Sequence, residues 1–283
     1  MPEGALATPR AGVALRPPRV DLAPALRVLG RLGIVAIYVF LLAPIVIVVL
    51  ASFNPENSAA LATTTFSLRW YRDFAANNNF VSAFKFSLWL GLIAALVATT
   101  IGLLASYAIV RFLGRRRPLG QSLALMPMMI PAILISISLL SMLTRVPLPE
   151  LLVLIIGHVL ICLPFTIAGI VASLDGVDPQ LELAAWTLGA SRLRILWEVT
   201  IPLVAPGLLS AMLFAFIVSF GDVYISLFLS GPGMTTLPIE IFAFIQWESS
   251  PVIAAITTVQ MLLIIALGLL IERLVGLRRI MRL

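Results

Sequence analysis

The residue best placed to do chemistry is a single carboxylate, Asp222, which lies inside a long apolar stretch in the segment VSFGDVYISLF. Burying an ionisable side chain at membrane depth costs free energy, so its presence in such a stretch indicates a functional role by default. The hydroxyls of Ser219, Tyr224 and Ser226 are close in sequence. With the carboxylate they could line a polar substrate path through the apolar stretch. Alternatively, Asp222 caps a broken helix beside Gly221 or pairs with an arginine of another chain.

The other candidate groups favour structural roles. His158 could relay protons, but no acid lies within a helical turn of it, so we expect a hydrogen-bonded packing residue. Glu240, Trp247 and Glu248 could meet an external protein or attract cations, although solvated loop charges are commoner. Cys162 is the single cysteine and is interpreted as a small packing residue. With no metal-ligand spacing and no nucleophile beside a base, we predict neither a metal site nor an enzyme.

The composition is that of an integral membrane protein. Hydrophobic residues make up 61% of the 283 residues and charged residues 11%, and the mean hydropathy is +1.10, more than a soluble core can bury. A helix needs roughly 20 apolar residues to cross a hydrocarbon core of about 30 Å. Stretches of that length, too long for barrel strands, are residues 33–53, 86–110, 122–143, 151–173, 203–230 and 252–275. We therefore predict an all-α membrane protein with six transmembrane helices and both termini on one side.

Prolines and small residues indicate that these helices are more than anchors. Pro44, Pro127, Pro131 and Pro164 fall within the first, third and fourth stretches, where proline frees backbone groups and kinks a helix. Small side chains allow close helix packing in lipid. In the second stretch they are Gly91, Ala94, Ala95, Ala98, Gly102 and Ala105. These features predict a compact bundle without distinguishing a transporter from a structural protein.

The basic residues predict the orientation. With a cytoplasmic N-terminus, 15 basic residues lie inside and 4 outside, as the positive-inside rule requires. Those inside are Arg10, Arg16, Arg19, Arg27, Arg31, Arg111, Arg115, Arg116, Arg117, Arg192, Arg194, Arg273, Arg278, Arg279 and Arg282; those outside are Arg69, Arg72, Lys85 and Arg145. The net charge of +6 is then explained by contact with anionic membrane lipid, and no nucleic-acid partner is predicted.

The domain organisation is simple. Residues 1–31, rich in Ala, Pro and Arg, are interpreted as a flexible cytoplasmic tail without apolar periodicity. The first apolar stretch is too long for a signal-peptide core, so we expect it to be retained as a membrane helix. Residues 32–283 then form one six-helix transmembrane domain.

A polar insert between the fourth and fifth stretches, within residues 175–202, is predicted to fold as helix, turn, helix. Asp178 and Pro179 start the first helix, and Gly189 ends it. Its residues Leu181, Ala184, Ala185 and Leu188 recur at helical spacing and predict one apolar face. Ser191 caps a second helix over residues 192–199, which ends before Pro202. The insert could rest in the membrane interface or dock into a groove of a soluble partner.

At these residues the chain resembles the membrane-spanning subunits of binding-protein-dependent ABC importers. Their cytoplasmic loop carries Glu-Ala-Ala, three residues, Gly, nine residues and Ile-x-Leu-Pro. Here Ala184, Ala185, Gly189 and Pro202 occupy the matching positions, with Val199 and Ile201 as conservative replacements. Leu183 stands at the acidic position, and Glu182 lies one residue earlier, about 100° away on a helix. The resemblance implies that Glu182, Ala184, Ala185, Leu188, Gly189 and Pro202 form a coupling helix for an ATPase.

Within that family, nearly the whole chain is similar to the second permease subunit of spermidine and putrescine importers. The similarity rests on LLAPIVIVVLASFN, RWYRDF, MMIPAILISISLL and FGDVYISLFLSGPGMTTLPIEIF. It implies a type I importer in a bacterial inner membrane, with a different second permease chain, two copies of a cytoplasmic ATPase that uses ATP and Mg, and an external solute-binding protein. Polyamine permeases often have a second acid before the one at Asp222, and this chain has Gly221.

Two other functions stay open on the residues alone. No G-x-x-x-x-G-K-[ST] loop is present, so the expected ATP hydrolysis belongs to a partner and this chain needs no cofactor of its own; a secondary carrier would also lack that loop. Inverted repeats and several buried charges, which a carrier should show, are not evident. A non-transporting scaffold is disfavoured by Asp222 and the prolines. Other cargo of the same importer class, such as opines or amino-acid derivatives, remains an alternative to polyamines.

Overall fold

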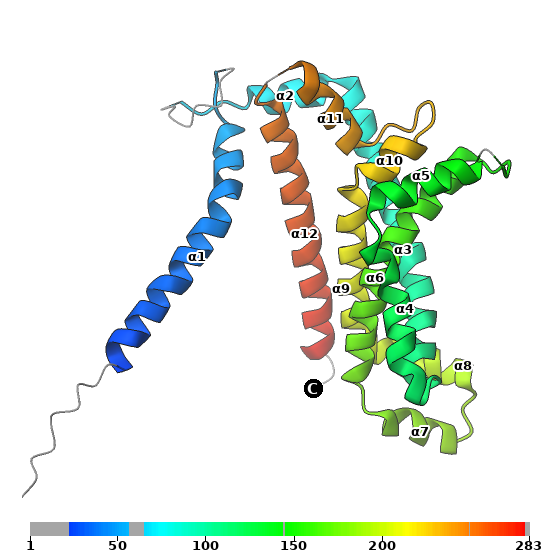
Figure 1. The fold of residues 1–283 in the computed structure, drawn as a ribbon. Helices are drawn as coiled ribbons and strands as arrows, with labels where there is room; N and C mark the ends of the chain where they lie inside the picture. Colours follow the sequence, from blue (N-terminus) through cyan, green and yellow to red (C-terminus); the bar gives the residue numbers. More distant parts are fainter. Residues whose placement is uncertain (1–22, 57–64, 144, 249, 281–283) are drawn as a thin grey trace, which may run out of the picture. The chain divides into compact units, whose positions relative to one another are not determined.

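The structure is a computed structural model that describes residues 23–56, 65–143, 145–248 and 250–280, without the side chains of 23–29 and 275–280. Every regular element in these ranges is helical (Figure 1). The elements are α1 (Ala23–Ala51), α2 (Arg69–Ala76), α3 (Asn78–Arg111), η1 (Gly114–Arg116), α4 (Arg117–Met129), α5 (Ala132–Leu143), α6 (Glu150–Asp175), α7 (Pro179–Thr187), α8 (Arg192–Ile195), η2 (Leu196–Thr200, a π-helical turn), α9 (Ile201–Phe220), α10 (Tyr224–Leu229), α11 (Leu237–Trp247) and α12 (Val252–Ile280). The predicted all-α class is confirmed.

Helix α1 contains the first apolar span. Its segment Gly30–Ala51 has 22 residues and a mean hydropathy of 3.1, enough to cross a bilayer, and Pro44 lies inside it without ending the helix. The expected flexible tail, residues 1–31, overlaps α1 from Ala23 onward, and residues 1–22 lie outside the described part of the chain. The chain divides into two compact units, the first ending at Ile47, with most of α1, and the second beginning at Val48.

Helices α3, α6 and α9 pack against one another and form the centre of the second unit. The small residues predicted on α3 make this packing possible: Ala94, Ala95 and Ala98 are completely buried. At Gly102 a Cβ would lie 2.5 Å from the Thr166 hydroxyl oxygen of α6. The two backbones therefore approach as closely as glycine permits, which is how helices in lipid gain van der Waals contact.

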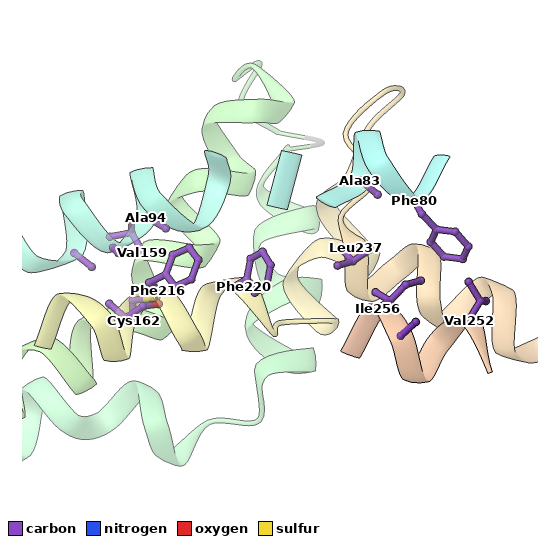
Figure 2. Close-up of a cluster of buried hydrophobic side chains, with 14 of the residues drawn as sticks. Phe80, Ala83, Ala94, Val159, Cys162, Phe216, Phe220, Leu237, Val252 and Ile256 are labelled. Atoms are coloured by element: carbon purple, nitrogen blue, oxygen red, sulfur yellow. Dashed lines mark hydrogen bonds between the residues drawn. The ribbon is translucent and has the colours of Figure 1, made fainter. Parts of the chain in front are cut away.

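Aromatic side chains fill the core towards α11 and α12. In Figure 2, Phe216 of α9 lies beside Val159 and Cys162 of α6, and Phe220 lies between this group and Leu237 of α11; the Phe216 and Phe220 rings stack at 5.2 Å between centroids. Cys162 is completely buried in the same cluster, and its thiol donates to the carbonyl oxygen of Ala215 at 3.2 Å. The interpretation of Cys162 as a packing residue is confirmed.

The third apolar stretch is not one straight span. Helices α4 and α5 meet at Ile130 and Pro131 with an angle of 87° between them. Proline lacks the N–H that a continuous helix needs and disfavours helical backbone at the preceding residue, so the chain turns at Pro131, whereas Pro127 stays inside α4. The described residues contain five long apolar helices, and the predicted six is reached only if α4 and α5 form one span.

The fifth stretch also differs from the expected residues 203–230. The helix continues unbroken from the insert through η2 into α9, and it ends at Phe220. Gly221, Asp222 and Val223 separate it from the short helix α10. Apolarity alone could not reveal this break, because Tyr224–Leu229 is as apolar as a continuing span.

Candidate functional site

The insert lies at the end of the second unit away from α2 and α11 (Figure 1). Its first helix is α7, and the Asp178 side chain accepts the N–H of Gln180 at 2.9 Å as predicted for an N-cap. Gly189 has a φ of +87°, a conformation that residues with a Cβ rarely adopt. The predicted start and stop of this helix are therefore confirmed.

The second part of the insert was predicted as a separate helix ending before Pro202, and this prediction is wrong. Ser191 does cap its start, accepting the N–H of Arg194 at 3.3 Å. The helix then passes through the π-helical turn η2 into α9, with Pro202 in the first turn of α9. The missing N–H of a proline is tolerated there because the preceding turn widens to the π-helical pattern.

The expected single apolar face of α7 is also wrong. None of the residues of α7 is buried, and apolar side chains stand exposed around it and on the following segment. They are Leu181, Leu183, Trp186, Leu188, Leu193 and Trp197, with Leu188 89% exposed. Large apolar side chains gathered on one surface segment typically mark an interaction site. We call these six residues the apolar surface of the insert.

Glu182 turns inward instead of joining the apolar surface. Its carboxylate accepts two hydrogen bonds from the Arg111 guanidinium, at 2.9 and 3.1 Å, and one from the Thr200 hydroxyl at 3.0 Å. The Arg111 and Glu182 side chains are only 14% and 13% exposed. A second ion pair, between Arg117 and Asp175 at 2.5 Å, joins α4 to the end of α6 nearby.

Asp222 lies in the break between α9 and α10 and caps α10. Its Oδ2 accepts the N–H groups of Ile225 and Ser226 at 2.8 and 3.3 Å. Asp222 and Tyr224 also line a pocket of about 460 Å³, whose other walls include Pro127 and Pro131 of the bent α4–α5 pair. Asp222 therefore caps a helix, as one of the two alternatives predicted, and it also lines a cavity.

Ser219 and Ser226 do not line that pocket; both bind His158. The His158 ring nitrogens lie 2.8 Å from the Ser219 hydroxyl and 3.1 Å from the Ser226 hydroxyl. All three side chains are buried. Because Ser219 belongs to α9 and Ser226 to α10, His158 bridges the break that contains Asp222. The hydrogen-bonded packing role expected for His158 is confirmed. That His158 binds both sides of the break that contains Asp222 was not predicted from the sequence. The only sequence signal for this contact is that His158, Ser219 and Ser226 are polar residues in apolar stretches.

Replacing His158 with leucine is expected to lower the free energy of unfolding by about 1–2 kcal/mol. Interhelical hydrogen bonds in membranes are worth about 0.6 kcal/mol on average and up to about 1.7, and two are lost. Thermal unfolding of the purified protein in detergent measures the change. The matched control is Thr99→Val, since the buried Thr99 hydroxyl has no hydrogen-bond partner among the described residues. Equal melting temperatures for the two variants would contradict the bridging role.

Glu240 and Glu248 lie at the end of the bundle opposite the insert. Glu240 is in the first turn of α11, and Trp247 at its end is 87% exposed. Glu248 lines a pocket of about 430 Å³ together with Arg69 and Asp73 of α2. Trp247 and Glu248 are exposed, as expected for a solvated surface, whereas Glu240 is only partly exposed.

An all-helical bundle with several helices long and apolar enough to cross a membrane, and an exposed helical insert between two of them, is the architecture of a multi-pass membrane protein. A family model described as Binding-protein-dependent transport system inner membrane component matches residues 98–280. The chain belongs to this family, and the resemblance found in its sequence is confirmed.

Curated relatives match most of the chain. The spermidine/putrescine transport system permease protein PotC of Haemophilus influenzae is 32% identical over 83% of this chain and 91% of its own length. The putrescine transport system permease protein PotI of Escherichia coli K12 is 32% identical over 78% of this chain and 81% of its own length.

A solved structure shares the fold. It is the crystal structure of a bacterial alginate ABC transporter in complex with an alginate pentasaccharide-bound periplasmic protein. That chain has a TM-score of 0.67 and 15% identity, and the match covers 89% of this chain and 95% of that one. At this identity the similarity concerns the fold alone, and it supports the all-helical importer-permease architecture.

Proposed function

We propose that this chain is a permease subunit of an ATP-driven importer that carries a small organic cation of the polyamine class, spermidine or putrescine, across the bacterial inner membrane. The observation that carries the proposal is the 32% identity to PotC and PotI over about four fifths of the chain. The Asp222 carboxylate beside a cavity supports it, because an amine crossing an apolar region gains from a negative charge.

The apolar surface of the insert is the proposed contact with a cytoplasmic ATPase. Six large side chains exposed next to a membrane bundle lose unfavourable contact with water when a soluble protein covers them. In this proposal ATP and Mg bind the ATPase dimer, whose closure pushes the insert. A second, different permease chain and an external solute-binding protein complete the importer, with both termini of this chain in the cytoplasm.

The test is uptake by the reconstituted importer. Vesicles that contain this chain, the second permease and the ATPase are supplied with the solute-binding protein and radiolabelled spermidine or putrescine. We expect accumulation that requires ATP and disappears when the ATPase is omitted. Uptake without the ATPase would mean a secondary carrier, whereas ATP hydrolysis without uptake of either polyamine would assign the importer to other cargo.

Replacing Gly189 with valine is expected to uncouple ATP hydrolysis from uptake. At a φ of +87° a residue with a Cβ costs about 1–2 kcal/mol, and a β-branched one more, so the turn that presents Leu188 is displaced. Uptake per ATP hydrolysed should fall by roughly fivefold or more. Gly189→Asn is the matched control, because asparagine tolerates this conformation. A bulky residue at Ala185 should act in the same direction, and unchanged coupling in Gly189→Val would contradict the proposed role of the turn.

A further inference from the structure

Glu182 is the only acidic residue of α7, and its side chain forms hydrogen bonds with residues outside that helix. The Arg111 partner is the last residue of α3, and the Thr200 partner lies in the π-helical turn that leads into α9. Tyr107 lies close enough to Glu182, Arg111 and Arg192 to interact with them electrostatically, and the Arg192 guanidinium lies 5.4 Å from the centre of the Phe112 ring at the end of α3. The end of α3, 71 positions away, and the turn before α9, 18 positions away, therefore both bind this one carboxylate.

Helix α7 needs an interaction with another helix to hold its position. It has nine residues and none of them is buried, and a helix this short is not stable by itself in water. Its main packing partners, α8 and η2, belong to the same segment between α6 and α9. The largely buried, bidentate pair with Arg111 thus joins α7 to the end of α3.

We propose that Arg111, Glu182 and Thr200 form a positioning clamp that makes α7 move as one body with the inner ends of α3 and α9. Force applied to the apolar surface of the insert then reaches the two central helices through this clamp. The inference rests on the proposed function, because it assumes that an ATPase pushes the insert. It gives Glu182 an internal role and leaves contact with the partner to the apolar surface.

The chain supplies a matched control for the clamp. Glu198 lies on the same segment and also binds an arginine at 2.9 Å, but its partner Arg194 is one helical turn away and both side chains are about two-thirds exposed, 65% and 60%. Glu182→Gln and Glu198→Gln remove the same charge by the same substitution. Only the first breaks a contact between separate helices, because Arg194 and Glu198 lie on one continuous helix.

In the reconstituted importer with radiolabelled spermidine as the probe, Glu182→Gln should reduce uptake per ATP hydrolysed by roughly three- to thirtyfold, the range for residues in a coupling network. Glu198→Gln should match the unmodified protein. The exchanged pair Arg111→Glu with Glu182→Arg should recover most of the loss, since it rebuilds the ion pair. Equal coupling in the two glutamine variants, or no recovery in the exchanged pair, would overturn the clamp.

Hydrogen exchange separates failure of the clamp from failure of the proposed function. In the purified complex, Glu182→Gln should speed exchange of the α7 amides, and Glu198→Gln should not. Unchanged exchange in Glu182→Gln overturns the clamp even if uptake falls, and faster exchange with unchanged coupling overturns its role in transmitting force. If the unmodified importer shows no ATP-dependent uptake, the proposed function fails, while the exchange comparison still decides whether the clamp exists.

Discussion

Asp222→Asn is expected to reduce polyamine uptake by roughly ten- to a hundredfold, the range for one hydrogen bond to a charged group. The substitution keeps an oxygen that can accept the N–H groups of Ile225 and Ser226, so the start of α10 should stay in place. It removes the negative charge at the wall of the cavity. Initial rates of radiolabelled spermidine uptake measure the effect, with the loss expected as a higher KM.

Asp222→Ala is the companion variant, because it removes both the charge and the cap. Loss of a helix cap costs about 0.5–2 kcal/mol, so this variant should show the transport defect of Asp222→Asn together with a lower melting temperature. Normal uptake by Asp222→Asn with a defect only in Asp222→Ala would assign Asp222 to capping alone. The sequence left these two roles open, and the pair of variants distinguishes them.

Gly102→Leu is expected to prevent the central helices from packing, at a cost of about 3 kcal/mol or more. Even a Cβ at this position would lie 2.5 Å from the Thr166 hydroxyl oxygen and 3.0 Å from the Thr166 Cβ. That hydroxyl donates its one hydrogen to the carbonyl oxygens of Leu163 and Ala98, at 2.9 and 3.2 Å, so displacing it would break this shared hydrogen bond. The yield of monodisperse protein in detergent and its melting temperature should both fall.

Gly268→Leu is the control for this prediction. Gly268 is also in a long apolar helix, α12, but the nearest atom to a Cβ there is a flexible Leu213 methyl group at 3.8 Å. We expect this variant to fold almost normally. Similar losses in both variants would show that leucine is disfavoured at any glycine of the bundle, contrary to a specific close approach of α3 and α6.

Much of the architecture could be predicted because its causes are local. A run of apolar residues long enough to span the bilayer determines where a membrane helix lies, as it did for α1, α3, α6 and α12. The caps at Asp178 and Ser191 and the turn at Gly189 depend on residues only a few positions apart. The small residues of α3 likewise predicted a closely packed face.

The breaks within the apolar stretches were harder to predict. Pro131 indicated a kink, but the 87° angle between α4 and α5 depends on what the two halves pack against, with α4 on α6 and α5 on α6 and α10. The end of α9 at Phe220 had weaker signals, Gly221 and the polar Asp222. Apolar residues on both sides of a break give it the hydropathy of a continuous span.

The sequence by itself determined the helices α1, α3, α6 and α12, the insert with its caps and turn, and the family, because each of these rests on residue types at short, regular spacing. Only the tertiary structure decided the partners of the polar groups. Glu182 binds Arg111 across 71 positions, and His158 binds Ser219 and Ser226 across 61 and 68. A charge or hydroxyl in an apolar surrounding must find a partner, but which one it finds depends on how distant helices pack together.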